Sequence, residues 1–596
     1  MIRRSRVAAA VALWIAVCCR LAAQTGAPVI FTVSMPQPAN HLFHVTMRAT
    51  GLAGPTQDFK MPVWTPGYYR VIDYARNVSH LHARDDAGHE LQWEKTTRNT
   101  WRMVTGGASA MTVDYDVYGA TRFGAQNYLD ENRAYISPPG FYLYLAGQLQ
   151  RPVQVTFRLP TGWTRIASGL DGQGAIYSAP DFDTFYDCPT LLGNQEVRQF
   201  AVRGVPHFAV LENVPDSVDR PKMLADLQFI VEAATAMMGD IPYRHYTFLL
   251  MGIGNGGIEH LDSASIAFNG KSLATENGYR RWLSYVAHEY FHNFNVKRIR
   301  PLALGPFDYD TENLTNMLWV SEGLSVYYQD LLLVRAGLIT PEQYLEKLAT
   351  TLGSFESAPG RHYQSATESS WNTWGTSGVG NDRNTTISYY DNGALLGAML
   401  DLQIRHASGN RQSLDDVMRA LYRDYYQGQH RGFTDAEFRA ECERAAGGSL
   451  EEVFSYAATT REPDYARYFA YAGLALDTTR TDGKGAYLGV NTHVEDGKLM
   501  VVAAQAGSPA AKEGVRADDE IAEVEGAKAT VKVLSDTLVS RKPGEQLKLK
   551  LVRGGEPREI EVVLAVNPVW TFRLHKAERL EPPAAATWKD WMRTAR

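Results

Sequence analysis

Cysteine is scarce in this sequence, and basic segments with interleaved aromatic residues are missing. Only 4 of the 596 residues are cysteine, so the chain is not a small disulfide-stapled scaffold. Its folded state must therefore rest on apolar cores, which 45% hydrophobic content and this length allow. Without basic aromatic runs, nothing in the sequence points to nucleic-acid binding.

A long apolar segment is also lacking at the N-terminus. Three arginines precede an apolar run of about eleven residues, Val7 to Val17, which is too short for a comfortable transmembrane helix. Leu21-Ala22-Ala23 then supplies a small-residue cleavage site. We expect residues 1–23 to be a signal peptide and the mature chain, without an integral membrane span, to be periplasmic or secreted. A retained anchor or a lipid-modified Cys18 or Cys19 is the alternative.

Removal of this leader would delete four arginines and change the net charge from −6 to −10. Two cysteines, Cys188 and Cys442, would remain in the mature chain, far apart in sequence. An oxidising compartment permits one disulfide, but the sequence does not show whether they pair.

The spacing of hydrophobic and polar residues changes twice along the sequence, which predicts three domains and a multidomain α+β fold class. Residues 28–203 contain short runs with period-two alternation and predict an N-terminal β-sandwich-like domain. Residues 204–480 predict a mostly helical domain, residues 485–568 form a third domain, and residues 569–596 form a C-terminal tail. Helical patterns are clearest over Pro221 to Met238, Pro341 to Leu352, Ala394 to His406 and Leu414 to Arg423.

The pattern H-E-x-x-H, at His288, Glu289 and His292, is the strongest chemical signal in the chain. Residues four apart lie on one face of a helix, so both imidazoles can reach a single Zn²⁺ while Glu289 faces the metal-bound water. Zinc lowers the pKa of that water to about 7, and a neighbouring carboxylate can take its proton during attack on a carbonyl. The spacing predicts a hydrolytic zinc site with Glu289 as the base.

A third protein ligand is needed, and Glu322 is the best candidate. It lies in a second apolar, helix-like run, Leu314 to Leu333, where a buried carboxylate needs a partner. Asp308, Asp310 and Glu312 also lie in the interval, but the prolines and glycine around them predict a loop that would hold a ligand less rigidly.

Several motifs together resemble a known family. The pair H-E-x-x-H and Trp319-Val-Ser-Glu-Gly323 is similar to the gluzincin metallopeptidases. With Gly256-Gly257-Ile258-Glu259-His260, the segment His292 to Pro301 and Trp64-Thr-Pro-Gly-Tyr68, the sequence resembles the glycyl aminopeptidase family. The resemblance covers nearly all of the chain after the leader. It implies a thermolysin-like, mostly helical catalytic domain with one Zn²⁺ per chain and glutamate as the third ligand.

The resemblance also implies roles in substrate binding and catalysis. Glu259 matches the glutamate that binds the free α-amino group of the substrate, on a strand edge to which Gly256 and Gly257 belong. Tyr390 matches the tyrosine that stabilises the oxyanion in related aminopeptidases, although Asn392 stands where those enzymes have lysine. His260 follows Glu259 in the same motif, but we assign it no part in catalysis, and a purely structural role is the alternative for this residue.

One supporting residue of the family is missing. In some gluzincins an aspartate four residues after the glutamate ligand supports a zinc histidine, and here that position is Val326. Ligating histidines nearly always donate their other N–H, so the partner must come from elsewhere in the fold.

The third domain resembles a PDZ domain through Tyr487-Leu488-Gly489-Val490 and Ala506 to Val515. In that fold the backbone N–H groups around Leu488, Gly489 and Val490 can hold the terminal carboxylate of a peptide that adds as a strand to the sheet. A PDZ domain used only for packing or oligomerisation is the alternative.

These features predict a secreted zinc aminopeptidase that acts on peptides with free N-termini. The resemblance implies that it removes small N-terminal residues, such as Gly or Ala. Two alternatives stay open. One is a zinc endopeptidase, which would not need the carboxylate of Glu259, and the other is a catalytically inert, PDZ-containing peptide-binding protein.

Overall fold

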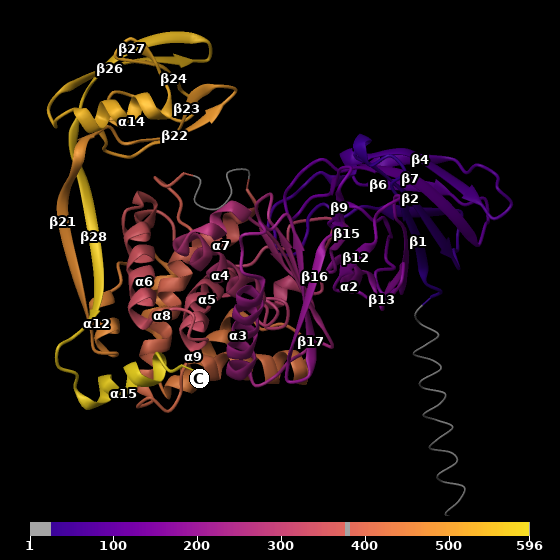
Figure 1. Ribbon diagram of the computed structural model, residues 1–596, viewed down its shortest axis with the longest axis horizontal. Coiled ribbons are helices and arrows are strands. Elements are labelled where there is room, and N and C mark those ends of the chain that lie inside the picture. Colours follow the sequence, from indigo (N-terminus) through magenta and orange to yellow (C-terminus); the bar gives the residue numbers. More distant parts are fainter. Residues whose placement is uncertain (1–25, 376–381, 595–596) are drawn as a thin grey trace, which may run out of the picture. The chain divides into compact units, whose positions relative to one another are not determined.

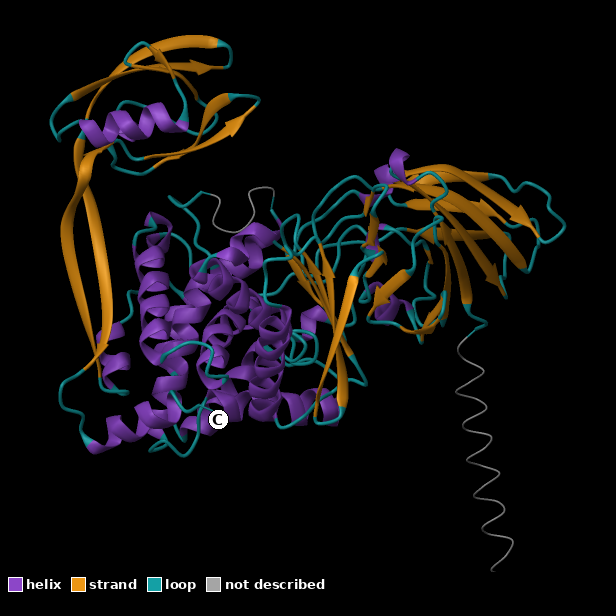
Figure 2. Ribbon diagram, in the orientation of Figure 1, coloured by secondary structure: helices purple, strands orange, loops and turns teal. Residues whose placement is uncertain are grey.

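The computed structural model describes residues 26–375 and 382–594, so the expected leader, residues 1–23, lies outside the described residues. Figures 1 and 2 show the elements. The chain forms two compact units, one of Met1–Thr235, Gly239–Arg298 and Ala303–Asn313, the other of Ala236–Met238, Ile299–Leu302 and Leu314–Arg596. None of the described helices combines the length and apolar character that a bilayer-spanning helix needs.

The first unit begins with a β-rich region, as the period-two alternation predicted. Its strands are β1 (Val29–Ser34), β2 (Leu42–Thr50), β3 (Thr56–Lys60), β4 (Val78–Asp85), β5 (Trp93–Thr97), β6 (Thr100–Val104), β7 (Ala110–Tyr118), β8 (Tyr128–Leu129), β9 (Arg133–Ile136), β10 (Tyr144–Leu145), β11 (Val153–Arg158), β12 (Arg165–Ser168), β13 (Asp171–Gln173), β14 (Ile176–Ala179) and β15 (Thr190–Gly193). They form a seven-stranded sheet, β13-β14-β11-β1-β2-β7-β4, and two four-stranded sheets, β10-β3-β6-β5 and β12-β15-β9-β8.

Alternating burial explains why these segments are strands. Along β7 the residues Met111, Val113 and Val117 are fully buried and Tyr115 is nearly so, while the residues that alternate with them, Thr112, Asp114 and Asp116, are half-buried. Burying each such side chain stabilises the fold by about 1.5–3 kcal/mol. Phe31 on β1 packs edge-on against Phe182 and is stacked on Phe185, two residues of the short helix α2 (Phe182–Tyr186). The β-rich region therefore has an aromatic core of its own.

A five-stranded sheet follows in the same unit. Its strands are β16 (Glu196–Val202), β17 (Val205–Glu212), β18 (Tyr246–Met251), β19 (Gly257–Glu259) and β20 (Ser263–Ala267), in the order β16-β17-β18-β20-β19. The short strand β19 is at the edge of the sheet and runs antiparallel to β20. The turn between β16 and β17 contains residues 203 and 204, so this hairpin spans the domain boundary expected there.

The first unit also contains α4 (Glu276–Phe291), which carries the H-E-x-x-H pattern, and all of α3 (Arg220–Met238) except its last three residues. Thr275 caps α4, because its hydroxyl accepts a hydrogen bond of 3.0 Å from the N–H of Gly278. Trp282, Val286 and Phe291 are buried on its apolar side. Burial of this face against the rest of the unit fixes how the polar residues of α4 are presented.

The second unit is mostly helical up to residue 470. Its helices are η6 (Trp319–Gly323), α5 (Leu324–Arg335), α6 (Pro341–Glu356), α7 (Ala366–Trp371), α8 (Tyr389–Ala407), α9 (Leu414–Ala420), η9 (Leu421–Gln427), α10 (Asp435–Ala446), α11 (Glu451–Ala458) and α12 (Tyr465–Ala470). Each of the four helices predicted from periodicity is confirmed. The run Leu314 to Leu333 is helical only from about residue 318, where the π-helical turn η6 leads into α5.

A two-stranded ribbon, β21 (Leu474–Tyr487) and β28 (Ala565–Lys576), leads to and from the PDZ domain (Figure 1). The PDZ elements are β22 (Val490–Glu495), β23 (Lys498–Ala504), α13 (Pro509–Lys512), β24 (Glu520–Val524), β25 (Ala527–Lys528), α14 (Val531–Ser540), β26 (Gln546–Arg553) and β27 (Glu556–Val563). The sheet order β22-β23-β24-β26-β27 leaves β22 at an edge.

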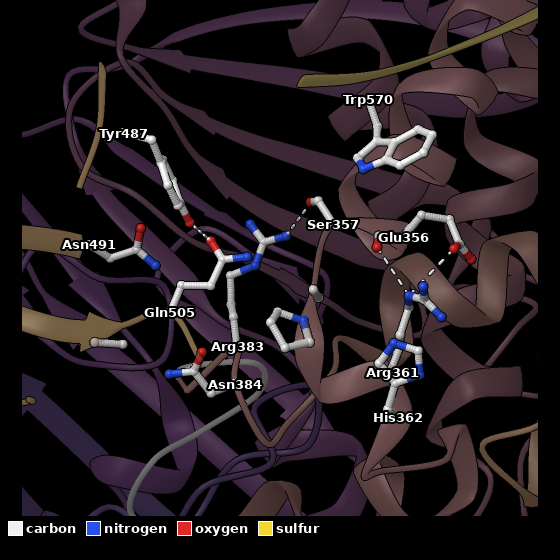
Figure 3. A pocket seen from close by; sticks show the side chains of 13 residues that line it. Glu356, Ser357, Arg361, His362, Arg383, Asn384, Tyr487, Asn491, Gln505 and Trp570 are labelled. Carbon is white, nitrogen blue, oxygen red and sulfur yellow. Dashed lines mark hydrogen bonds and ion pairs between the residues drawn. The ribbon is translucent and has the colours of Figure 1, made fainter. Parts of the chain in front are cut away.

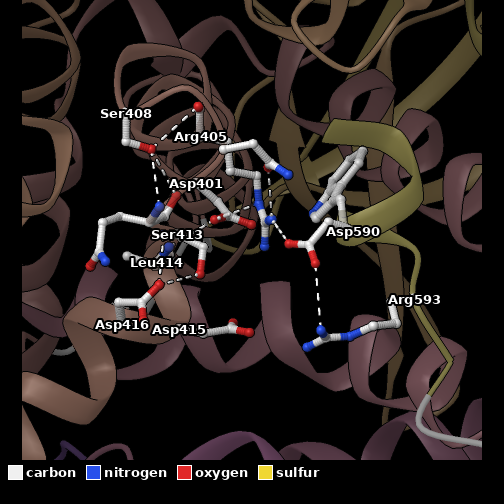
Figure 4. A network of polar contacts seen from close by, with 12 residues as sticks. Asp401, Arg405, Ser408, Ser413, Leu414, Asp415, Asp416, Asp590 and Arg593 are labelled. Carbon is white, nitrogen blue, oxygen red and sulfur yellow. Dashed lines mark hydrogen bonds and ion pairs between the residues drawn. The ribbon is translucent and has the colours of Figure 1, made fainter. Parts of the chain in front are cut away.

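The segment after the PDZ domain returns to the helical part of the second unit through α15 (Pro582–Trp591). Trp591 is fully buried, and its indole N–H donates to the hydroxyl of Tyr327 at 2.8 Å. Asp590 pairs with Arg405 at 2.5 Å, and Arg405 also pairs with the buried Asp401 at 3.1 Å (Figure 4). The residues expected to form a C-terminal tail therefore include a strand of the ribbon and a docked helix.

Candidate active site

Helix α4 brings the two histidines of the pattern together. His288, Glu289 and His292 are all buried, with His292 immediately after the last residue of the helix. The Nε2 atoms of the two histidines are 2.9 Å apart. Two imidazole nitrogens that face each other in this way are suited to share one cation.

The outer partner of one histidine comes from the chain just beyond the helix. The Nδ1 of His292 lies 2.6 Å from the backbone oxygen of Asn295, and as the donor it leaves the Nε2 lone pair of His292 available for a metal. His292 therefore has an outer partner that does not come from position 326. The sequence could not reveal it, because a backbone oxygen has no residue signature.

Glu322 lies in the π-helical turn η6 and is 2% exposed. In residues 26–375 and 382–594, the only group of three or more His, Cys, Asp or Glu side chains that could hold a metal ion is His288, His292 and Glu322, whose ligand atoms lie within 4.8 Å of one another. Two imidazoles and one carboxylate are a donor set of catalytic zinc sites. The residues present therefore fit this metal.

Two of the three loop carboxylates that were the alternatives, Asp310 and Asp308, have other partners. Asp310 pairs with Lys60 at 2.5 Å and accepts a hydrogen bond from the amide of Asn99 at 2.8 Å. Asp308 accepts from the N–H of Asp310 and from the hydroxyl of Thr311. These two side chains stabilise the first unit and its loop.

Glu289 lies directly against the edge strand β19. A Cβ added to Gly257 would be 2.1 Å from Glu289 Oε1 and 2.6 Å from the hydroxyl of Tyr285. Any side chain at position 257 would therefore displace the Glu289 carboxylate. This close approach explains why the strand has glycine here.

Glu259 is presented on the same side of β19, because side chains two apart in a strand point the same way. It is 3% exposed. Gly67, from the Trp64-Thr-Pro-Gly-Tyr68 loop, covers its carboxylate, since a Cβ at position 67 would be 2.6 Å from Glu259 Oε2. The first unit thus brings a loop of its β-rich region to the strand that carries Glu259.

A second segment of the β-rich region covers the glycines before Glu259. Phe123 forms an isolated parallel bridge with Asn255, and a Cβ added to Gly256 would be 2.5 Å from the Phe123 ring. Phe123 packs edge-on against Tyr68, with ring centroids 5.0 Å apart. Aromatic side chains therefore wall this end of the strand, a feature that the sequence analysis did not identify.

His260 takes part in a buried polar cluster with Asp187 and Lys297, which the sequence analysis also missed. Lys297 Nζ is 2.5 Å from Asp187 Oδ1, and the N–H of Leu261 donates to the other carboxylate oxygen at 2.6 Å. Burial alone would raise the pKa of Asp187, but Lys297 and His260 hold it below its usual value. The cluster ties the segment after β19 to the residues that follow α4, which supports a structural role for His260.

Tyr390 lies in the first turn of α8, in the second unit. Its neighbour Tyr389 is fully buried, and the two rings are stacked with centroids 4.8 Å apart. The hydroxyl of Thr373 donates to that of Tyr389 at 3.3 Å. Gly393 on α8 packs on Gly323, with a Cβ at position 323 only 2.4 Å from the Cα of Gly393. This contact fixes α8 next to the turn that carries Glu322.

In the PDZ domain, Leu488 is buried in the core and Gly489 has φ +82°, a left-handed backbone conformation. The carbonyl of Gly489 accepts from the N–H of Gln505 at 2.8 Å. Val490 begins the edge strand β22, which among the described strands pairs only with β23. The open edge of β22 is the kind of edge to which a peptide strand adds.

A separate cavity of about 430 Å³ lies in the second unit (Figure 3). Polar side chains line much of it, among them Arg361, Arg383, Tyr487 and Gln505. Arg361 pairs with Glu462 at 2.8 Å, and Arg383 donates to the backbone oxygen of Ser354 and the hydroxyl of Ser357. The lining of this cavity includes none of the predicted catalytic residues and none of the residues predicted to bind a peptide at the PDZ domain.

Comparison with known proteins gives three family matches. Residues 30–194 match the Peptidase M61 N-terminal domain, residues 281–396 match M61 glycyl aminopeptidase, and residues 486–564 match the PDZ domain. No curated protein sequence matches the chain.

Among solved structures, an aminopeptidase N family protein from Idiomarina loihiensis is similar with a TM-score of 0.84 and 25% identity, over 94% of this chain and 99% of that chain. An M1 zinc metallopeptidase from Deinococcus radiodurans has a TM-score of 0.46 and 12% identity, over 74% of this chain and 95% of that chain. The second likeness is weak.

Proposed function

We propose that this zinc metallopeptidase of the aminopeptidase type removes single residues from the free N-termini of peptides. The chain carries the N-terminal and catalytic domains of the M61 glycyl aminopeptidases, followed by a PDZ domain. Small N-terminal residues such as Gly or Ala are its preferred substrates. The observation that carries this proposal is the position of Glu289 and Glu259 along one side of β19.

Each chain binds one Zn²⁺ through His288, His292 and Glu322, a set supported by the close grouping of their ligand atoms. When bound, the metal supplies Lewis acidity toward water and the scissile carbonyl. The contact from His292 Nδ1 to the Asn295 oxygen holds that ring in the tautomer that ligates.

Glu289 acts as the general base and then as the acid. Its carboxylate takes the proton of the attacking water and passes it to the amine that leaves. The position of Glu289 Oε1 against Gly257 supports this role, because a substrate strand that pairs with β19 would carry its peptide bond past this carboxylate.

Glu259 binds the α-ammonium group and so sets how many residues are removed. Gly257 and Glu259 are two positions apart, about 7 Å along a strand. The Glu289 carboxylate lies beside Gly257 at one end of this interval, and the Glu259 carboxylate is at the other. The interval has room for one amino acid residue between a bound ammonium and the attacked carbonyl. This spacing favours removal of single residues and argues against an endopeptidase.

The hydroxyl of Tyr390 donates a hydrogen bond to the oxyanion that forms at the attacked carbonyl. Its place in α8, next to the turn with Glu322, supports the role, and its side chain is less buried than that of Tyr389. Such a donor contributes a few kcal/mol to the transition state.

The remaining parts of the proposal concern export and the PDZ domain. Residues 1–23 direct export to the periplasm or the medium and are then removed, as the arginines and the apolar run of the leader suggest. The backbone N–H groups around Leu488, Gly489 and Val490 hold the terminal carboxylate of a peptide that pairs with β22.

A pair of peptides of identical sequence, one with a free and one with an acetylated N-terminus, tests the activity. We expect the zinc-loaded protein to remove residues stepwise from the free peptide only, as followed by mass spectrometry. Internal cleavage of both peptides would make the protein an endopeptidase. Cleavage of neither, with peptide binding retained at the PDZ domain, would make it a binding protein.

A further inference from the structure

Tyr285 lies in α4, one turn before Glu289, and sequence patterns give it no role. Its hydroxyl and Glu289 Oε1 both lie close to the point where a Cβ on Gly257 would be, at 2.6 and 2.1 Å respectively. The two oxygens are therefore on the same side of β19, the side to which Glu259 also points. The side chain is half-buried, so a ligand beside the strand can reach it.

The electrostatic surroundings of Tyr285 show that it lies near both glutamates. Burial raises the pKa of its phenol above the ordinary value, and the charges of Glu289 and then Glu259 raise it further. The phenol is therefore neutral at any physiological pH, with both oxygen lone pairs available.

We propose that Tyr285 is a further substrate-binding residue, whose phenol oxygen accepts a hydrogen bond from the α-ammonium group held by Glu259. An ammonium group has three N–H donors, and a carboxylate covered on one side by Gly67 satisfies only part of them. A neutral oxygen on the same side of β19 supplies a second acceptor without adding negative charge next to Glu289. This inference rests on the proposed aminopeptidase activity and adds a residue that selects for a free N-terminus.

The acceptor role explains why a phenol, and not another carboxylate, stands here. A third carboxylate near Glu259 and Glu289 would raise the pKa of its neighbours by repulsion and so favour their protonated forms, in which Glu289 accepts no proton and Glu259 has no charge to pair with the ammonium. A phenol accepts from the ammonium and stays uncharged. Tyr285 therefore adds recognition of the amine while the charge around the base is unchanged.

The test compares the wild-type enzyme with Tyr285→Phe, which removes one hydroxyl and keeps the ring. Tyr279→Phe is the matched control, because Tyr279 lies on the same helix and its hydroxyl donates to Asp226 at 2.8 Å. Calorimetry measures the binding of glycinamide, which has a free amine, and of N-acetylglycinamide. Steady-state kinetics on a peptide with a free N-terminus give kcat and KM, and metal analysis gives the zinc content.

We expect Tyr285→Phe to weaken glycinamide binding about tenfold or more, the loss of one hydrogen bond to a charged group. KM should rise by a similar factor, with a smaller change in kcat and unchanged zinc content and N-acetylglycinamide binding. Glycinamide affinity within twofold of wild type, or an equal loss in Tyr279→Phe, would overturn the proposal. A lower kcat with unchanged glycinamide affinity would overturn it too, since the hydroxyl would then act on the reaction and not on the amine.

The same measurements distinguish a failure of the proposed aminopeptidase function from a failure of the role proposed for Tyr285. If the wild-type enzyme cleaves the acetylated peptide as well as the free one, the aminopeptidase assignment is wrong whatever the Tyr285 variant does, and the role of Tyr285 falls with it. If the wild type cleaves only the free peptide and Tyr285→Phe binds glycinamide normally, the assignment stands and only the role of Tyr285 is wrong.

Discussion

Gly67 lies against the carboxylate of Glu259, so close that a Cβ at position 67 would be 2.6 Å from Oε2 and 2.9 Å from Oε1. The two residues are 192 positions apart in the sequence. The first comes from a loop of the β-rich region and the second from the edge strand of the five-stranded sheet. The β-rich region therefore covers the carboxylate of Glu259.

Gly67→Ala is expected to lower kcat/KM for peptides with free N-termini by about a hundredfold, because the added methyl group displaces Glu259 and small misplacements have large effects on rate. Steady-state kinetics measure this. Gly88→Ala is the control, since Gly88 has a similar φ of +86° but no atom within 4 Å of an added Cβ. Equal activity in the two variants would show that the contact with Glu259 has no importance for catalysis.

Glu289→Gln should lower kcat by a factor of about 10²–10⁴ while zinc content is unchanged, because the amide keeps the shape but cannot accept the proton. Metal analysis and kinetics on the same preparation check both points. Glu276→Gln, at the exposed first turn of α4, should have normal activity. Substantial turnover by zinc-loaded Glu289→Gln protein would mean that another group is the base.

Removal of the metal gives a further test. A chelator should abolish activity, and added Zn²⁺ should restore it, since the grouped side chains His288, His292 and Glu322 offer a donor set that suits zinc. His292→Ala should lower both zinc content and activity. Full activity after the zinc has been removed, shown by metal analysis, would contradict the zinc-dependent mechanism.

His207 should make the stability of the first unit depend on pH. Burial lowers its pKa to about 4, below the 6.5 of an unfolded chain, and its Nε2 is 2.9 Å from the hydroxyl of Tyr243. Between these values the unfolded chain binds the proton and the folded chain does not. Its contribution is therefore fully present above pH 6.5 and is lost at about 1.4 kcal/mol per pH unit as the pH falls toward 4.

Thermal unfolding midpoints measured from pH 7 to pH 4.5 check this expectation. The fall should be smaller in His207→Gln, which does not titrate in this range. A parallel fall in both proteins would mean that other groups cause the pH dependence.

Asp401 is expected to be important for the stability of the second unit. It is fully buried, and it accepts from Arg405, from the N–H of Leu414 at 2.8 Å and from the hydroxyl of Tyr327 at 2.6 Å. Asp401→Ala would leave Arg405 buried with one fewer carboxylate and should cost about 3–5 kcal/mol. Asp424→Ala, which breaks an exposed pair with Arg423, should cost at most about 1 kcal/mol. Chemical denaturation of both variants measures the difference, and similar losses would contradict the role of the buried pair.

Local sequence patterns predicted much of the fold correctly. The helices of the catalytic part and the β-rich N-terminal region follow from hydrophobic periodicity. The run Leu314 to Leu333 was predicted less well, because the chain becomes helical only near residue 318 and begins there with a π-helical turn. A π-turn adds one residue to a helical turn, and over a single turn of five residues this shift is too small for hydrophobic periodicity to show.

The residues of the candidate site divide in the same way. Spacing on one helix is enough to pair His288 with His292 and to place Glu289 beside them. The proximity of Gly67 to Glu259, the wall formed by Phe123 and Tyr68, and the cluster of Asp187, Lys297 and His260 join segments that are far apart in the chain. No local pattern marks such contacts.

The sequence by itself determined the chemical groups and their order: two imidazoles one helical turn apart with a carboxylate next to the first, a glutamate after paired glycines, and a domain of PDZ type. Only the tertiary structure decided that Glu289 and Tyr285 lie against Gly257, that Gly67 covers Glu259, and that Asn295 supplies the partner of His292. The physical reason is that backbone periodicity fixes neighbours within a helix or strand, whereas contacts between elements depend on how buried apolar faces pack.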